Sequence, residues 1–433
     1  MLQQWFKLRE NKSNLRTEVF AGITTFMTMA YIIFVNPSIL STTGMDFNAV
    51  FAATCISAAL ATILMGLIAN YPFALAPGMG LNAYFAFVVG SQYGYPVALA
   101  AVFMSGLVFI ALTATRGREA IINSIPMSLK LAVGAGIGLF IALIGFKNAG
   151  IVVANPNTLV HLGNVRDPNV MLAIFGLIVT GALVVTKVRG ALLIGIGVTT
   201  IVGLVTGVAP VAEGFRLFAM PPGLKHFGEF AGGMRDLLAL GLAAVPIVFS
   251  FAFVDVFDTV GTLVGVASKA KMLDKDGKLP RVNHALVADA VGTVAGAVLG
   301  TSTVTTYIES AAGVTEGGRT GLTAVVTGLL FIAALFFAPL AGLVPSAATA
   351  PVLIIVGVFM MEPITKINFE DYAEGIPAFL AFAMMPFTFS IAEGIVWGVL
   401  AYVALRLAAR RFSEVSVTMY VLSVLFILRF VLA

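Results

Sequence analysis

Charged residues are scarce in this sequence: Asp, Glu, Lys and Arg make up 11% of its 433 residues. Soluble domains carry about 25%, so the chain has too little charge to cover a water-soluble globule. Hydrophobic residues supply 59% of the positions, and the mean hydropathy is +1.02. Apolar runs of roughly 20 residues, the length of a membrane-spanning helix, recur throughout. The composition predicts an all-α polytopic membrane protein in a lipid bilayer, with no role in nucleic-acid binding.

Cysteine and histidine are also rare. The only cysteine, Cys55, lies inside an apolar run, which rules out an intramolecular disulfide and fits a small buried filler. The three histidines, His161, His226 and His284, fall in or beside predicted loops. We therefore expect neither a metal site nor a cofactor, and any titrating group within the membrane should be a carboxylate.

The apolar runs form two sets of seven. The first set is 18–38, 48–69, 72–90, 95–115, 130–146, 169–186 and 190–207, and the second is 238–266, 285–300, 301–317, 320–338, 345–361, 375–389 and 391–408. A last run, 416–432, is of uncertain topology. A cytoplasmic N-terminus places most of the 25 Lys and Arg residues on the cytoplasmic side, as the positive-inside rule requires. We expect no cleaved leader, because the first long run already resembles a span.

An odd number of spans in each half gives the two halves opposite topology, as in the inverted repeats of secondary transporters. In both halves the third span is unusual: YPFALAPGMGLNAYF (71–85) and TSTVTTYIESAAGV (301–314) each predict a few extended residues followed by a short helix. Broken spans at matching positions indicate a binding site near the middle of the membrane.

Acidic residues within spans are few, and each costs about 2.5–3.5 kcal/mol at a helix centre on insertion scales. Asp255, Asp258, Thr259 and Thr262 recur at i, i+3, i+4 and i+7, which places one polar stripe on an apolar helix. Such a stripe must face protein or water. It would serve either as part of a binding site or as a hydrogen-bonded strut between helices.

The first span carries a milder stripe of Thr24, Thr28 and Tyr31. Threonines often bond to their own helix backbone, so this stripe is equally compatible with a structural role and with a place in the site.

Extended residues that end near the membrane centre would leave the unpaired N–H groups of each following half-helix exposed there. Asn82 and Ser310 are expected to begin these two half-helices, and Glu309 directly precedes the second. Irregular backbone at this depth must line a cavity or be buried in protein. We therefore predict a polar cavity framed by the two helix ends, Glu309 and Asp258.

The same segments carry a resemblance to a known family. GITTFMTMAYIIFVNP (22–37), APGMGLNAYF (76–85), FVDVFDTVGTLVGVA (253–267) and TTYIESAAGVTEGGRTGLTA (305–324) closely resemble the AzgA-like purine permeases. These form a branch of the nucleobase–cation symporter and nucleobase–ascorbate transporter superfamily. The resemblance extends over essentially the whole chain.

The resemblance implies a UraA-like fold of fourteen segments in 7+7 inverted repeats, with short antiparallel strands in segments three and ten. The core domain would comprise 18–115 and 238–338, and the gate domain 130–207 and 345–408. The C-terminal segment, 409–433, goes beyond this plan.

The resemblance also implies site residues. Asp258, Glu309 and Asn82 match the acids of the eighth and tenth spans and the polar residue of the third, and Gly80 lies two before Asn82. Further matching positions are Tyr307 and Ile308, which would contact the base through ring and backbone, and Thr262, which is a histidine in uracil carriers. The first-span stripe adds Thr28 to the substrate-binding candidates, and Asp255 joins Asp258 and Glu309 as a candidate for proton coupling.

The function expected from these features is proton-coupled import of purine nucleobases, guanine/hypoxanthine or adenine or both, by an elevator-type movement. The protein would be a multi-pass protein of the plasma (bacterial inner) membrane, and the sequence leaves a homodimer open. The alternative is an anion carrier for sulfate or a carboxylate on the same fold, although two acids in the site would repel an anion. An intramembrane enzyme using Asp255 and Asp258 is a further alternative, but no nucleophile or metal set accompanies them. We expect no enzymatic activity.

Overall fold

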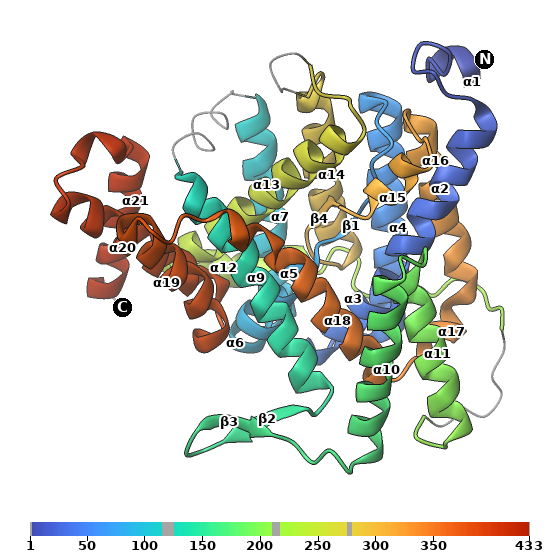
Figure 1. Ribbon diagram of the computed structural model, residues 1–433, viewed down its shortest axis with the longest axis horizontal. Helices are drawn as coiled ribbons and strands as arrows, with labels where there is room; N and C mark the ends of the chain where they lie inside the picture. The colour runs from blue at the N-terminus through green and yellow to red at the C-terminus, as the bar shows by residue number, and fades with distance from the viewer. Residues whose placement is uncertain (1, 115–124, 210–216, 275–278, 433) are drawn as a thin grey trace.

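The computed structural model describes residues 2–114, 125–209, 217–274 and 279–432 (Figure 1). Its first half contains α1 (Leu2–Trp5), α2 (Leu15–Met29), α3 (Ile32–Leu40), α4 (Phe47–Leu64), β1 (Leu75–Pro77), α5 (Met79–Ala83), α6 (Ser91–Tyr93), α7 (Tyr95–Ala114), α9 (Met127–Asn148), β2 (Val152–Asn155), β3 (Leu159–Leu162), α10 (Pro168–Val185) and α11 (Ala191–Val205). Two π-helical turns, η2 (Met65–Ala69) and η3 (Tyr84–Gly90), extend α4 and α5.

The second half contains α12 (Phe230–Ala239), α13 (Ala244–Lys269), α14 (Val282–Leu299), β4 (Val304–Thr306), α15 (Ser310–Thr315), α16 (Gly321–Ala334), α17 (Ala338–Gly342), α18 (Ser346–Met361), α19 (Tyr372–Thr388), α20 (Ile391–Ala408) and α21 (Val417–Leu432). Short 3₁₀ turns, η1 (Ser41–Thr43), η4 (Gly241–Ala243), η5 (Leu335–Phe337), η6 (Glu362–Lys366) and η7 (Phe412–Glu414), join several of these helices.

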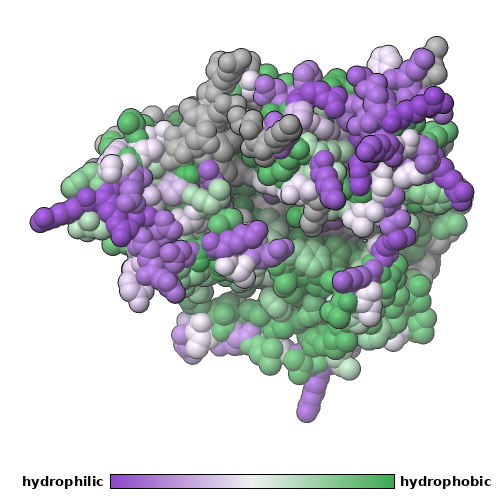
Figure 2. Space-filling model, turned by 45° about the horizontal axis from the view of Figure 1, so that its top comes forward, coloured by the Kyte–Doolittle hydropathy of each residue, from purple (hydrophilic) through white to green (hydrophobic). Residues whose placement is uncertain are grey.

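Within the described residues, ten helical stretches are long and apolar enough to cross a membrane, and two shorter apolar helices cover 191–205 and 417–427. Figure 2 shows a broad hydrophobic area on one face, with hydrophilic side chains gathered along its upper and left margins. The predicted helical membrane fold is confirmed. One predicted span, 18–38, is divided between α2 and α3, which are separated at Ala30 and Tyr31.

The helices pack in two groups. In one group α16 packs against α2 and α4, and α14 packs against α4 and α7. In the other, α9 packs against α18 and α19, and α10 packs against α11 and α18. The backbones of α9 and α18 approach closely: an added Cβ at Gly138 would lie 2.6 Å from the Gly357 oxygen, and one at Gly357 would lie 2.5 Å from the Gly138 oxygen. Glycine is therefore required on both sides of this contact.

The two broken spans meet as predicted. Strands β1 and β4 pair antiparallel, with Leu75 opposite Thr306 and Pro77 opposite Val304. Figure 1 shows them inside the molecule, between helices from both halves of the chain. The short strands expected in segments three and ten are thus confirmed. A second hairpin, β2–β3, extends from the lower edge in Figure 1 and was not expected, because its segment was interpreted as a connection between spans.

The end of α20 is held by a buried arginine. Arg406 is 2% exposed and forms ion pairs with Glu374 at 2.8 Å and Glu414 at 2.6 Å. Nearby, a 2.6 Å hydrogen bond from Arg411 lowers the pKa of Asp371 below its usual value. Because the folded-state pKa is lowered, this pair contributes stability at neutral pH and loses it as the pH falls through that pKa. The cluster connects α19 and α20 to the turn before α21.

Candidate functional site

The antiparallel pair of β1 and β4, which we call the strand crossing, satisfies the backbone hydrogen bonds of both segments. The Gly78 N–H donates to the Thr303 oxygen at 2.9 Å, and the Tyr307 N–H donates to the Ala74 oxygen at 2.9 Å, so the pairing continues beyond the strands. All three residues of each strand are buried. Unpaired backbone groups are not tolerated at this depth in a membrane protein, which explains why the two extended segments meet each other.

Two threonines complete this unit in matching ways. The Thr62 hydroxyl of α4 donates to the Leu75 oxygen and accepts from the Leu75 N–H, both at 2.9 Å. The Thr293 hydroxyl of α14 bonds the oxygen and N–H of Val304 at 3.0 and 3.3 Å. Leu75 and Val304 are the first residues of their strands. In both halves of the chain, a threonine hydroxyl from a neighbouring helix therefore bonds the backbone of the first strand residue. It fixes the first residue of each strand, ahead of the half-helix that follows the strand.

Glu309 lies at the turn between β4 and α15. It is the residue that caps α15, yet its side chain makes no cap hydrogen bond. Its carboxylate instead accepts a 2.7 Å hydrogen bond from the Tyr31 hydroxyl. The Thr28 hydroxyl bonds mainly to its own helix, at 2.8 Å to the Thr25 oxygen, and is 3.5 Å from the Glu309 backbone oxygen. The structure therefore brings the first-span stripe to Glu309.

Of the two predicted half-helix starts, Ser310 is confirmed as the first residue of α15, whereas Asn82 is wrong. Helix α5 begins at Met79, three residues before Asn82, because Gly78 already has the extended conformation of a capping residue. The N–H groups of Ser310, Ala311 and Ala312 donate to the oxygens of the residues three positions before them. The first turn of α15 therefore does not present free donors as expected, and a bound ligand would meet side chains there.

The polar stripe of α13 divides between two roles. Asp258 is half-buried, and its carboxylate lies within electrostatic range of Glu309. Asp255 is 1% exposed, and its Oδ2 lies 3.0 Å from the Thr293 hydroxyl. Thr259 donates to Asp289 Oδ1 of α14 at 2.8 Å. Asp258 thus belongs with Glu309, whereas Asp255 and Thr259 belong to a strut that joins α13 to α14.

Asn82 is fully buried beside the strand crossing. The Ser302 hydroxyl donates to its Oδ1, and its Nδ2 meets the Met79 sulfur at 4.0 Å. An added Cβ at Gly80 would collide with the Cγ2 atom of Ile137 on α9. Gly80 therefore marks the point where α5 passes directly over a helix of the other group.

The remaining predicted residues differ in exposure. The Tyr307 hydroxyl donates to the Pro77 oxygen at 2.5 Å, which ties the end of β4 to β1. Ile308, the next residue, is 53% exposed although the strand before it is buried. Thr262 is buried one turn beyond Asp258.

Sequence reasoning left three contributors out of the site. Tyr31 was placed on a stripe but not among the site residues. Ser302 and Asp289 are fully buried, and Asp289 Oδ1 also lies 3.3 Å from the Thr306 hydroxyl. Only the helical spacing of Tyr31 with Thr24 and Thr28 offered a signal, because the other two become neighbours of the site through folding.

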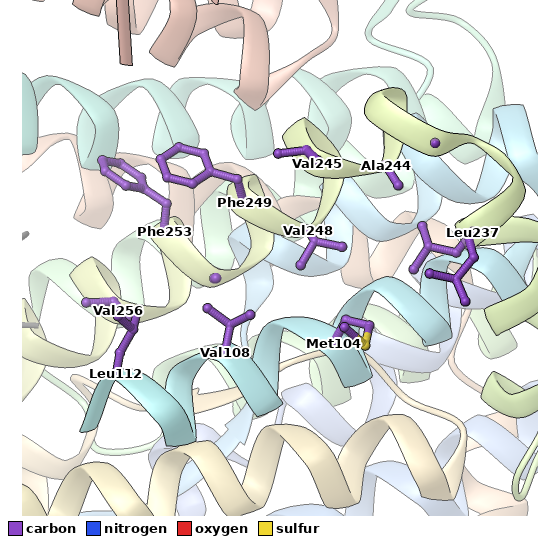
Figure 3. A pocket seen from close by; sticks show the side chains of 13 residues that line it. Met104, Val108, Leu112, Leu237, Ala244, Val245, Val248, Phe249, Phe253 and Val256 are labelled. Carbon is purple, nitrogen blue, oxygen red and sulfur yellow. The ribbon is translucent and has the colours of Figure 1, made fainter. Parts of the chain in front are cut away.

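A groove of about 480 Å³ lies elsewhere, between α7, α12 and α13 (Figure 3). It is lined on α13 by side chains including Phe249, Phe253 and Val256, and on α7 by Met104 and Val108. By helical spacing these three residues of α13 point away from Asp258. Because the groove is lined by apolar residues, it has no group that could orient a polar ligand, and we place the candidate site at the strand crossing.

The sequence is similar to those of known proteins along nearly its whole length. Residues 16–397 match a family described as the permease family. The chain is 53% identical to a putative permease of Methanocaldococcus jannaschii, over 99% of this chain and 98% of that one. It is 47% identical to an adenine permease of Escherichia coli K12, over 100% and 96%. It is 46% identical to a guanine/hypoxanthine permease of Bacillus subtilis, over 99% of each chain.

Among solved structures, the transmembrane domain of a cyanobacterial bicarbonate transporter, BicA, is similar. The TM-score is 0.67 at 16% identity, covering 89% of this chain and 97% of that one. At this identity the likeness concerns the fold alone.

Proposed function

The chain belongs to the permease family that residues 16–397 match, and from this premise we propose that it carries purine nucleobases across the membrane by proton symport. The observation that carries the proposal is the Glu309 carboxylate, held by Tyr31 at the strand crossing within electrostatic range of Asp258. Relatives named adenine permease and guanine/hypoxanthine permease share 44–47% identity with it over nearly the full length. The protein is a permease and not an enzyme.

Purine bases offer the chemistry that this site can bind. Their edges carry N–H donors and ring-nitrogen acceptors, and an ionised carboxylate is an acceptor only. Glu309 would therefore accept an N–H of the base in a charge-assisted hydrogen bond. The Asn82 amide, whose Nδ2 meets only a sulfur at 4.0 Å among the described residues, would donate to a ring nitrogen. Ile308, exposed beside Glu309, would contact the ring face.

Proton coupling is assigned to Asp258. Two carboxylates that face one buried site repel each other, so the empty site favours the uptake of one proton. Among the described residues no hydrogen bond fixes Asp258 as an acceptor, whereas Tyr31 donates to Glu309. Asp258 is thus freer to alternate between its two protonation states. Asp255 Oδ2 accepts a hydrogen bond from the Thr293 hydroxyl, so Asp255 is the weaker candidate for carrying the proton.

In the elevator movement that we propose, the two helix groups would be the core and gate domains. The candidate site lies in the group of α2, α4, α14 and α16, and Gly80 contacts Ile137 of the other group. A glycine at the contact leaves no side chain to obstruct sliding. The distribution of Lys and Arg supports a cytoplasmic N-terminus, and the location that we propose is the plasma membrane.

An anion carrier on the same fold is the second candidate. The side chains argue against it, because Glu309 and Asp258 would both repel an anion.

A competition experiment separates these candidates. Purified protein should bind a tritiated purine, and unlabelled adenine, guanine or hypoxanthine should displace it, whereas sulfate and bicarbonate at a 1000-fold excess should not. Absence of saturable purine binding, together with saturable binding of labelled sulfate or bicarbonate, would reverse the assignment.

A further inference from the structure

The first span is broken at the depth of the strand crossing. Helix α2 ends at Met29, α3 begins at Ile32, and Tyr31 lies between them. The Thr28 hydroxyl bonds to the Thr24 and Thr25 oxygens of the preceding turn, an arrangement that bends helices. Tyr31 lies at this break, and its hydroxyl contacts Glu309, 278 positions later in the chain.

The Tyr31 hydroxyl has little freedom. The residue is 1% exposed, and its hydroxyl lies 2.7 Å from Glu309 Oε1. An ionised carboxylate only accepts, so the phenol must be the donor. Within the described part of the chain, no other side chain donates to the Glu309 carboxylate. The phenol therefore fixes the orientation of the carboxylate through Oε1, and no other side chain occupies Oε2 among the described residues.

We propose that Tyr31 is a positioning and specificity-determining residue: by holding Oε1, it limits Glu309 to accepting one N–H of the base through Oε2. This inference rests on the proposed function. A carboxylate with both oxygens free pairs best with two adjacent donors, as it does with the arginine fork. Guanine has such a pair in its N1–H and 2-amino groups, whereas hypoxanthine has only N1–H on the same edge. Tyr31 therefore reduces the advantage that guanine would otherwise have.

The variant Tyr31→Phe removes the hydroxyl and keeps the ring. The affinity for hypoxanthine should fall about three- to tenfold, because the carboxylate loses its fixed orientation, a loss comparable to one hydrogen bond. The affinity for guanine should fall less, because both oxygens become available to its paired donors. The ratio of the guanine to the hypoxanthine affinity should thus rise at least about threefold.

Equilibrium binding of both tritiated bases to purified protein measures this ratio, with the melting temperature as a check on folding. Tyr402→Phe on α20 is the matched control, since this tyrosine is also buried but its hydroxyl lies 3.5 Å from the backbone oxygen of Glu414 on η7. This control variant should leave the affinity ratio unchanged. An equal loss for both bases, or no loss for either, would overturn the role of Tyr31. Failure of the wild-type protein to bind any purine would instead overturn the proposed function.

Discussion

Replacement of Glu309 by Gln is expected to weaken purine binding at least about 100-fold while the protein remains folded. The Gln side chain has the same shape, and its carbonyl oxygen can still accept the hydrogen bond from Tyr31 that Oε1 accepts now. Its amide group then occupies the place of Oε2 and points donors at the N–H of the base. The loss of a charge-assisted hydrogen bond, about 1.5–3 kcal/mol, is joined by the cost of two opposed donors.

Equilibrium binding of tritiated purine to purified Glu309→Gln tests this expectation. The matched control is Glu316→Gln at the other end of the same short helix, where the carboxylate pairs with Arg189 at 2.5 Å. The control should bind as the wild type does. An affinity of Glu309→Gln within about threefold of the wild-type value would show that this carboxylate does not hold the base.

Replacement of Asp258 by Asn should uncouple uptake from the proton gradient. The Asn side chain is neutral at every pH, so it cannot pick up a proton on one side of the membrane and release it on the other. A difference of one pH unit is worth about 1.36 kcal/mol per proton and supports about tenfold accumulation at one proton per base. In the variant the internal and external base concentrations should become equal.

Proteoliposomes with an alkaline interior and labelled purine outside measure this accumulation, and addition of a protonophore provides the uncoupled reference. Asp236→Asn, at an exposed position on α12, is the control and should accumulate base as the wild type does. Persistent gradient-driven accumulation by Asp258→Asn would assign the proton to another group, with Asp255 the next to examine.

Local sequence signals predicted the extended segments beside the site. The unusual third span of each half indicated extended backbone followed by a short helix, and the family resemblance implied short antiparallel strands in these two segments. The structure pairs them as β1 and β4. Composition and apolar runs likewise predicted the helical membrane fold, because both depend on the lipid environment and not on contacts between distant residues.

Other features depend on distant contacts and were not predicted. The start of α5 at Met79 follows from the backbone of Gly78, although Asn82 is the better capping residue by type. The hydrogen bond between Tyr31 and Glu309 joins residues 278 positions apart. Asp255 and Asp258 share a helical stripe, yet one contacts α14 and the other faces Glu309, because different elements pack beside successive turns of α13. Periodicity identifies a face of a helix but not its neighbours.

The most direct test of this account is a structure of the purified protein with a bound purine, determined by cryo-electron microscopy in a lipid nanodisc. We predict planar density beside the crossing of β1 and β4, with a ring N–H donor about 3 Å from Glu309 Oε2 and the Tyr31 bond to Oε1 retained. Density for the base in the apolar groove between α7, α12 and α13, or an empty site at Glu309 under saturating purine, would contradict it.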